Sequence, residues 1–288
     1  MMRRATILTA AVAALLTAVP AGAMEKKTKK VARELIARHQ DAIVMVEVVL
    51  KVNMTYNGRQ FPEQERKLEA NGTVIGADGL IVVSRAQVDP PVPKRQGLRV
   101  DISTSSVKIV LADGTEHKAK IVQTDRDLDM AFVRPLEKVK LPHVELKKTA
   151  DPELLDDLVS ITRLGRKANR VPGVSASRVL SIIKKPRTRY VSSGRLFQGC
   201  PVFNSAGEAL GLSLHRASGG ASLAVLTCED ILEVAGNVPQ VKADAAGDDG
   251  DDGEEKTDKK PEEKTEEKKE EAKPAEGKAA EEEGKAGE

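Results

Sequence analysis

The chain has little of the residue types on which many ligand sites depend. Among 288 residues it has two cysteines, four histidines, two tyrosines, four phenylalanines and no tryptophan. Cysteine and histidine do not cluster at ligand spacing, which argues against a metal centre. The few aromatic side chains leave no platform on which nucleic-acid bases could stack. With no phosphate-cradling glycine loop either, we expect no cofactor, no metal and no nucleic acid among its ligands.

Long apolar runs are also missing beyond the N-terminus. Residues 1–23 combine two early arginines, a short apolar run and the small residues Ala21-Gly22-Ala23, the layout of a cleavable secretory signal. The run is shorter than the roughly 20 residues that span a bilayer. We therefore expect a signal peptide of residues 1–23, a mature chain without a transmembrane span, and export to the periplasm or the outside of a bacterial cell envelope. Retention of this segment as a signal anchor stays open.

The C-terminal residues 241–288 lack apolar character almost entirely, with Val241 as their only branched aliphatic residue. Such a segment cannot bury enough apolar surface to offset its loss of entropy, which predicts a disordered tail. It holds 19 acidic and 10 basic residues, a net charge of −9, and the whole chain carries +2, so residues 1–240 carry +11. Either the tail only keeps the protein in solution, or it screens the basic body or tethers it to a charged envelope component.

The remaining body, residues 24–240, is rich in short β-type runs. Helical spacing of Val31, Leu35 and Ile36 predicts one amphipathic helix over residues 26–39, and a closing helix is expected over 229–235. Between them we predict strands at 42–52, 72–75, 80–84, 106–111, 117–123, 130–134, 158–162, 174–183, 201–204, 209–214 and 221–226, separated by turn signals such as Ala-Asp-Gly. Many short strands and few helices favour an all-β barrel or sandwich.

Four segments, in this order, resemble the trypsin-like serine proteases of the HtrA/DegP type. They are residues 71–84, with an Asp-Gly turn leading into a strand; residues 107–125, a hairpin; residues 127–133, Asp-Leu-Asp-Met-Ala-Phe-Val; and residues 199–212, Gly-Cys-Pro-Val-Phe-Asn-Ser-Ala-Gly-Glu-Ala-Leu-Gly-Leu. The resemblance covers about residues 30–236. It implies a double six-stranded β-barrel with an N-terminal helix and a short C-terminal helix. No PDZ module follows, because only the tail remains after residue 235.

Catalysis on such a fold needs a nucleophile, a base and a buried acid that orients the base. The resemblance places the acid at Asp129, the base at Ala86 and the nucleophile at Gln198. Alanine cannot move a proton, and a glutamine amide is neither nucleophile nor base. With no imidazole beside it, we interpret Asp129 as an ordinary strand-edge aspartate.

A shift of register does not restore the missing groups. The histidines are His39, His117, His143 and His215, and the serines nearest the nucleophile loop are Ser192 and Ser193. We interpret these histidines as solvated or packing residues, and the serines lack the Gly-x-Ser-Gly-Gly setting. The resemblance also implies oxyanion donors at the amides of Leu196 and Gln198. Cys200 replaces a glycine there, and its Cβ disfavours the conformation that points those amides inward.

The two cysteines, Cys200 and Cys228, permit one disulfide in an exported protein, and the sequence leaves open whether it forms. The favoured hypothesis is a catalytically inactive protease homologue of the cell envelope that binds a protein or an extended peptide, as a regulator or scaffold. Two alternatives stay open: an active HtrA-like endopeptidase with shifted catalytic residues, and a structural envelope protein acting through its charged tail. The sequence does not give the oligomeric state.

Overall fold

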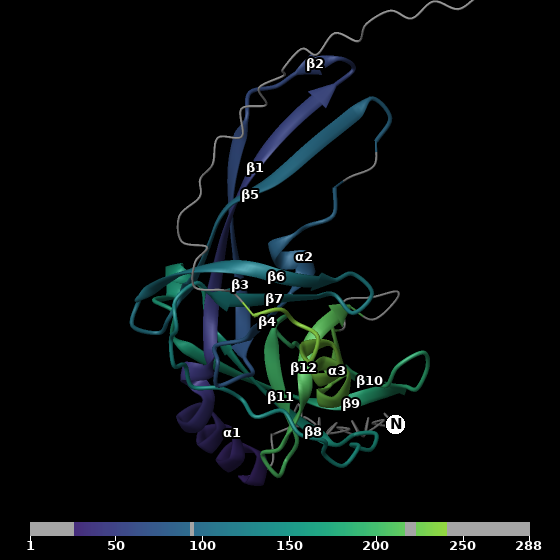
Figure 1. Cartoon of the computed structure of the whole chain (residues 1–288). Helices are drawn as coiled ribbons and strands as arrows, with labels where there is room; N and C mark the ends of the chain where they lie inside the picture. The colour runs from purple at the N-terminus through teal and green to yellow at the C-terminus, as the bar shows by residue number, and fades with distance from the viewer. Residues whose placement is uncertain (1–25, 93–94, 217–222, 241–288) are drawn as a thin grey trace, which may run out of the picture. The chain divides into compact units, whose positions relative to one another are not determined.

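The computed structural model describes residues 26–92, 95–216 and 223–240. The predicted signal peptide and the predicted tail lie outside these residues. The described chain forms two antiparallel β-barrels of six strands each, with one helix before them and one after them (Figure 1). The all-β double barrel implied by the resemblance is therefore confirmed. Among the described residues, no helix combines the length and the apolar character needed to cross a membrane.

The first barrel closes because its first strand pairs with two others. In order around the barrel its strands are β1 (Ile43–Tyr56), β3 (Gln64–Val74), β4 (Ile81–Ser84), β7 (Met130–Pro135), β6 (Glu116–Asp125) and β5 (Leu98–Val110), which pairs back with β1. A short strand, β2 (Arg59–Gln60), pairs only with the end of β1. The interior holds side chains at alternate positions of β1, such as Val46 and Val48, as expected for a period of two residues.

The second barrel follows residue 150. Its strands in order are β8 (Asp157–Arg163), β9 (Pro172–Ile183), β10 (Arg189–Ser192), β13 (Leu223–Thr227), β12 (Ala209–Arg216) and β11 (Cys200–Phe203), which pairs with β8 and closes the ring. Its interior is a separate apolar cluster of Leu158, Val179, Tyr190, Leu196, Val202, Leu210 and Val225. Each barrel therefore has an interior of its own.

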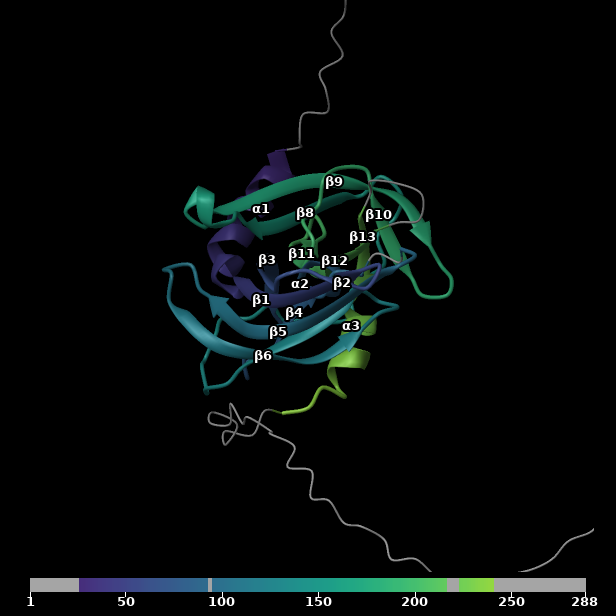
Figure 2. The ribbon, with the colours of Figure 1, turned by 90° about the horizontal axis from the view of Figure 1, so that it is seen from above.

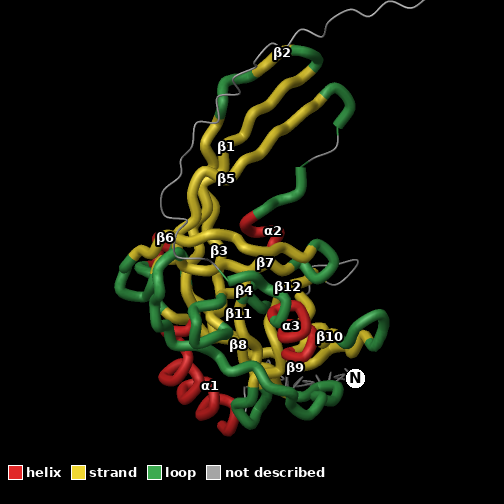
Figure 3. Tube along the Cα trace, in the orientation of Figure 1, coloured by secondary structure: helices red, strands yellow, loops and turns green. Residues whose placement is uncertain are grey.

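Helices are few, as Figure 3 shows. Helix α1 (Lys26–His39) matches the predicted helix and buries Ala32 and Leu35. Helix α3 (Cys228–Ala235) begins where the Thr227 side chain accepts a hydrogen bond from the backbone N–H of Asp230, at 3.3 Å, which satisfies one of the free amides of the first turn. A single turn, α2 (Arg85–Val88), follows β4. Short 3₁₀ turns occur at Gln40–Ala42 and Arg166–Ala168.

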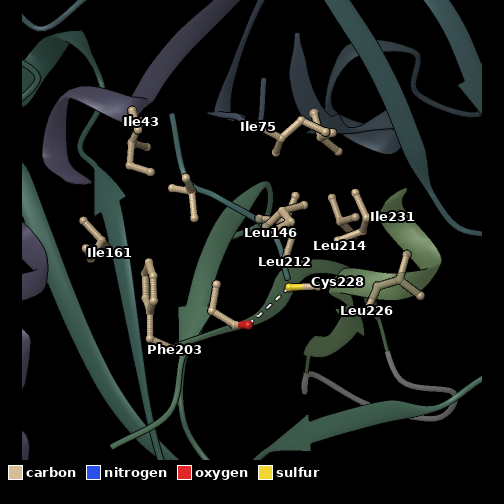
Figure 4. Packing of buried hydrophobic residues seen from close by; sticks show 14 of the residues in the cluster. Ile43, Ile75, Leu146, Ile161, Phe203, Leu212, Leu214, Leu226, Cys228 and Ile231 are labelled. Atoms are coloured by element: carbon tan, nitrogen blue, oxygen red, sulfur yellow. Dashed lines mark hydrogen bonds between the residues drawn. The ribbon is translucent and has the colours of Figure 1, made fainter. Parts of the chain in front are cut away.

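The largest apolar cluster lies between the barrels rather than inside either one. It combines residues of α1 and the first barrel, such as Leu35 and Phe132, with residues of the second barrel and α3, such as Phe203 and Ile231. Figure 4 shows part of this packing. Seen from above, β5 and β6 lie on one side and β8 and β9 on the other (Figure 2). Because this cluster draws on both barrels, the barrels share a core.

Polar contacts add to this junction. The side chain of Arg163, on β8, is 3% exposed; it donates hydrogen bonds to the carbonyl oxygens of Ile43 at 2.7 Å, Arg170 at 2.8 Å, and Gln40. The Thr73 hydroxyl, on β3, donates to the carbonyl oxygen of Gly199 at 2.7 Å. One guanidinium group thus joins the entry of β1 to the second barrel.

The strands predicted from sequence agree with the structure over most of the body. The predictions missed β2, β10 and the first halves of β3 and β5. The missed half of β3 carries exposed charged residues, and β5 runs through Ser103-Thr104-Ser105-Ser106. In β3, polar residues on both faces hide the alternation that marks a half-buried strand, whereas Leu98-Arg99-Val100-Asp101-Ile102 of β5 does alternate and was overlooked.

Candidate functional site

The position of the triad acid is occupied by a buried carboxylate. Asp129 directly precedes β7 and is 9% exposed. Its Oδ1 accepts a hydrogen bond from the backbone N–H of Ala86 at 2.8 Å, and its Oδ2 accepts one from the Ser84 hydroxyl at 2.7 Å. Asp129 therefore lies at the edge of a strand, as interpreted from the sequence, but its carboxylate is buried and each of its oxygens accepts a hydrogen bond. β4 pairs with β7 at Ser84 and Met130, and this pairing brings the segments together.

The backbone of Asp129 is as constrained as its side chain. Its φ is +55°, in the left-handed region where aspartate is one of the tolerated residue types. Its carbonyl oxygen accepts from the N–H of Arg85 at 3.0 Å. One aspartate thus binds three consecutive residues, Ser84, Arg85 and Ala86.

The other half of the site is the loop before β11, which is tied down on both sides. The N–H of Gly199 donates to the carbonyl oxygen of Ser213 at 2.8 Å, and the Ser213 hydroxyl donates to the carbonyl oxygens of Phe197 and Cys200. Gly199 has φ +77°, and a Cβ there would overlap the carbonyl oxygen of Asn71 on β3. Only glycine fits here, because the two barrels touch through this backbone.

The two positions assigned to oxyanion donors carry side chains that pack into the protein. Leu196 is 5% exposed and belongs to the interior of the second barrel. Gln198 is half-buried, and its Nε2 donates to the carbonyl oxygen of Leu214 at 3.4 Å. The loop also carries Arg195, whose guanidinium group lies 5.2 Å from the ring centre of Phe197. Neither side chain at the two donor positions is ionisable.

The described histidines lie in other settings. His39, at the end of α1, stacks on Phe203 with ring centres 5.3 Å apart; burial, assisted by the charge of Arg38, lowers its pKa. His117 lies in the β5–β6 hairpin and His143 is exposed. The side chain of His215 lies outside the described part. The hydrogen-bond partners of the Asp129 carboxylate in the described residues are Ser84 and Ala86 alone.

The two cysteines are free, buried thiols, so the disulfide that the sequence left open is not formed. The Cys200 thiol donates to the Thr162 hydroxyl at 3.3 Å, and the Cys228 thiol donates to the carbonyl oxygen of Ala209 at 3.2 Å (Figure 4). Burial raises the pKa of Cys200 to about 12 and that of Cys228 to about 11. A thiol so far from ionisation is a poor nucleophile at neutral pH.

Sequence reasoning named Ala86, Asp129 and Gln198, and the structure shows what surrounds them. Ser84 on β4 and Ser213 on β12 were missed, although they hold the Asp129 carboxylate and the loop before β11. A serine in an otherwise apolar strand is the signal that could have found both, because a buried hydroxyl needs a partner. Around the described residues, no group of three or more histidine, cysteine, aspartate or glutamate side chains could hold a metal ion.

A family model of the trypsin-like peptidase domain matches residues 70–212. The matched stretch runs from the middle of β3 to β12 and contains Ser84, Asp129 and the loop before β11. No curated protein matches the chain. The family match and the double barrel agree, and the fold is that of a trypsin-like serine protease.

Proposed function

We propose that this trypsin-like peptidase domain is catalytically inactive and works by binding proteins or extended peptides. The observation that carries the proposal is the hydrogen bond from the backbone N–H of Ala86 to the Asp129 carboxylate. The triad acid orients a base beside it, and the resemblance assigns the acid to Asp129 and the base to residue 86, so this hydrogen bond puts the two assigned positions next to each other. Residue 86 is alanine, whose methyl group neither accepts nor donates a proton.

The nucleophile position supports the same proposal. The Gln198 amide is engaged with the carbonyl oxygen of Leu214, and an amide nitrogen is not nucleophilic. An enzyme of this type that lacks nucleophile and base retains only what backbone donors and binding supply, roughly 10³–10⁴-fold over water. That remnant of catalysis is too small for protein turnover, whereas binding of an extended chain along a strand edge needs neither group.

The order of the four motifs and the layout of residues 1–23 add a protein type and a cellular location to the proposal. The four segments follow the order of the HtrA type, and we assign the domain to that type. The layout of residues 1–23 supports export, so the binding function is placed in the bacterial cell envelope. There the domain would regulate an active relative or act as a scaffold.

The test restores the missing groups in the mature chain, from Met24. The unmodified protein should neither hydrolyse unfolded casein nor react with a fluorophosphonate, which labels activated serines. The double variant Ala86→His with Gln198→Ser should gain fluorophosphonate labelling, because an imidazole at residue 86 would meet Asp129 and face the new hydroxyl. A third substitution, Cys200→Gly, returns the loop to the family pattern and should strengthen labelling.

Matched controls separate restored catalysis from incidental reactivity. Gln198→Ser alone supplies a serine without a base, and Ala86→His with Gln198→Ala supplies a base without a nucleophile; both should stay unlabelled. Binding is measured separately, as the fluorescence anisotropy of labelled unfolded casein with unmodified protein. Casein cleavage and labelling by the unmodified protein would show an active enzyme and overturn the proposal.

A further inference from the structure

Part of the first barrel's sheet continues beyond the barrel as a three-stranded ribbon. β6 pairs with β5 only from Val107 to Val110, and β4 pairs with β3 only from Gly72 to Val74. Beyond these pairings, β1 stays between β3 and β5 as far as residue 52 and pairs with β5 as far as residue 56. We call residues 50–56, 64–68 and 98–106 the ribbon, and Figures 1 and 3 show it projecting from the barrel.

The two outer edges of the ribbon differ in character. The β3 edge carries exposed Glu65, Arg66 and Lys67, the kind of charged edge that prevents strands of other molecules from pairing. The β5 edge from Leu98 to Ser106 has no lysine and no proline. The β3 edge therefore presents charged residues in succession, whereas the charged residues of the β5 edge, Arg99 and Asp101, alternate with apolar ones.

The β5 edge also adjoins an apolar surface. Val52, Met54 and Tyr56 on β1 lie opposite Ile102, Val100 and Leu98 on β5. Residues directly opposite each other share a face of the sheet, so these six form one apolar strip. Tyr56 is 41% exposed and the other five are half-buried.

An open groove of about 620 Å³ runs beside the same edge. It is lined by Val92, Arg95, Gln96 and residues 98–101. Its lining thus comes from β5 and from the residues that directly precede it.

We propose that a second copy of this chain occupies the groove, with the two β5 edges paired antiparallel about a two-fold axis at Val100. A two-fold contact is self-complementary, so each residue of one edge must suit its opposite in the other. An axis at Val100 places Arg99 of each copy opposite Asp101 of the second copy, and Leu98 opposite Ile102. The charges attract on one face and the apolar side chains meet on the other.

The neighbouring registers are less favourable, which selects the axis. An axis at Arg99 places the two Arg99 side chains opposite each other, and an axis at Asp101 does the same with two aspartates. Like charges directly opposite in a sheet are destabilising. An axis that passes between two residues, such as Arg99 and Val100, would place apolar residues of one copy opposite polar residues of the other. The apolar face of one ribbon would then continue into the polar face of its partner. Pairing at Val100 joins two ribbons into one sheet and extends the apolar strip across both copies, which goes beyond the proposed binding function.

The charge pattern provides the first test, made by sedimentation velocity on the full mature chain over a range of concentrations. The unmodified chain should dimerise as concentration rises. Arg99→Asp leaves two carboxylates in each opposed pair and Asp101→Arg leaves two guanidinium groups, so each variant alone should be monomeric. An equimolar mixture of the two variants should dimerise again, because every opposed pair then has opposite charges. Both positions are exposed, and circular dichroism checks that the variants fold.

The β3 edge supplies the control for this experiment. Charge reversal on the β3 edge, Glu65→Lys with Lys67→Glu, should leave dimerisation unchanged. The proposal is overturned if the unmodified chain is monomeric at every concentration, or if the mixture associates no better than its two components.

A cysteine scan tests the register itself. In the Val100→Cys variant the new thiols face each other across the axis, within the separation of about 4.5–5.5 Å between opposed Cα atoms that a disulfide tolerates, so oxidation should give a covalent dimer. In Ile102→Cys the two new thiols lie four residues apart along the strands, roughly 13 Å, and should not cross-link. The native cysteines are buried and do not compete. Equal cross-linking by both variants would contradict the register.

Discussion

At the scale of single residues, burial decides what the reactive side chains can do. Cys200 begins β11, directly after the loop that includes Gln198, and its thiol is fully buried against Thr162. Asp129, which the resemblance assigns to the triad acid, has a backbone amide and a serine hydroxyl as the partners of its carboxylate. In this structure both side chains pack in the interior and form hydrogen bonds with neighbouring residues.

The thiols give a prediction with a defined pH dependence. Burial raises the pKa of Cys200 to about 12 and that of Cys228 to about 11, above the ordinary value of about 8.5. The folded state therefore favours the neutral thiol, and this contribution to stability is complete below about pH 8.5 and is lost as the pH rises towards 11 and 12. The double variant Cys200→Ala with Cys228→Ala should show a shallower alkaline loss of stability in urea unfolding.

Thiol labelling checks the same prediction directly. At pH 8 a maleimide should modify the folded protein roughly a hundredfold or more slowly than the protein unfolded in urea, because only the thiolate reacts. Fast labelling of either cysteine in the folded protein would contradict the burial that the structure gives them.

At the scale of elements, separate segments are joined by a few buried polar groups. Arg163 on β8 donates to carbonyl oxygens of the 3₁₀ turn after α1, the first residue of β1 and the β8–β9 connection. Arg170 in that connection has φ +53°, a costly conformation for a non-glycine residue, and its carbonyl oxygen is held by Arg163. Arg170 also lies 3.5 Å from Glu47 on β1. The basic β8–β9 connection is thereby fastened to the first barrel.

Replacing Arg163 by methionine should be strongly destabilising. The substitution keeps much of the side-chain volume but leaves three carbonyl oxygens without their donor, and hydrogen bonds to a charged group contribute about 1.5–3 kcal/mol each. We expect the free energy of unfolding to fall by about 3 kcal/mol or more, measured by urea denaturation. Lys167→Met, at an exposed position in the same connection, is the matched control and should change it by less than about 0.5 kcal/mol. Similar small effects for both variants would refute the role of Arg163.

At the scale of the whole molecule, the shared core makes the two barrels one folding unit. Phe132 belongs to the first barrel and is fully buried in the cluster that contains Phe203 and Leu212 of the second. The backbone of Gly199 touches Asn71 across the same junction. Neither barrel buries all of its apolar surface without the other.

A cavity at the shared core should therefore lower the stability of both barrels together. Phe132→Ala should cost about 3–5 kcal/mol, which corresponds to a fall in Tm of roughly 6–20 °C for a body of this size. Differential scanning calorimetry should still give one transition, with equal calorimetric and van't Hoff enthalpies. Leu180→Ala, at a site 56% exposed on β9, should leave Tm nearly unchanged. Two separate transitions in the Phe132 variant would show that the barrels unfold independently.

Local patterns were enough to predict most strands and both terminal helices of the body. The amphipathic spacing around Leu35 predicted α1 to its last residue, His39, because the periodicity of a helix depends only on residues three or four positions apart. The sequence resemblance named Ala86, Asp129 and Gln198 by counting along motifs. It could not predict that Asp129 is buried, because burial depends on which strands close over a residue. Ser84 and Ser213 were missed for the same reason.

The sequence by itself determined most element types and their order, since these follow from local periodicity, and its resemblance to trypsin-like proteases implied the double barrel. Only the tertiary structure decided the burial of Asp129, the separate environments of Cys200 and Cys228, the contact of Gly199 with Asn71, and the ribbon whose β5 edge stays unpaired in the described chain. Each of these depends on segments far apart in the sequence meeting in space. Desolvation, pKa shifts and free strand edges are consequences of that meeting, so no local pattern encodes them.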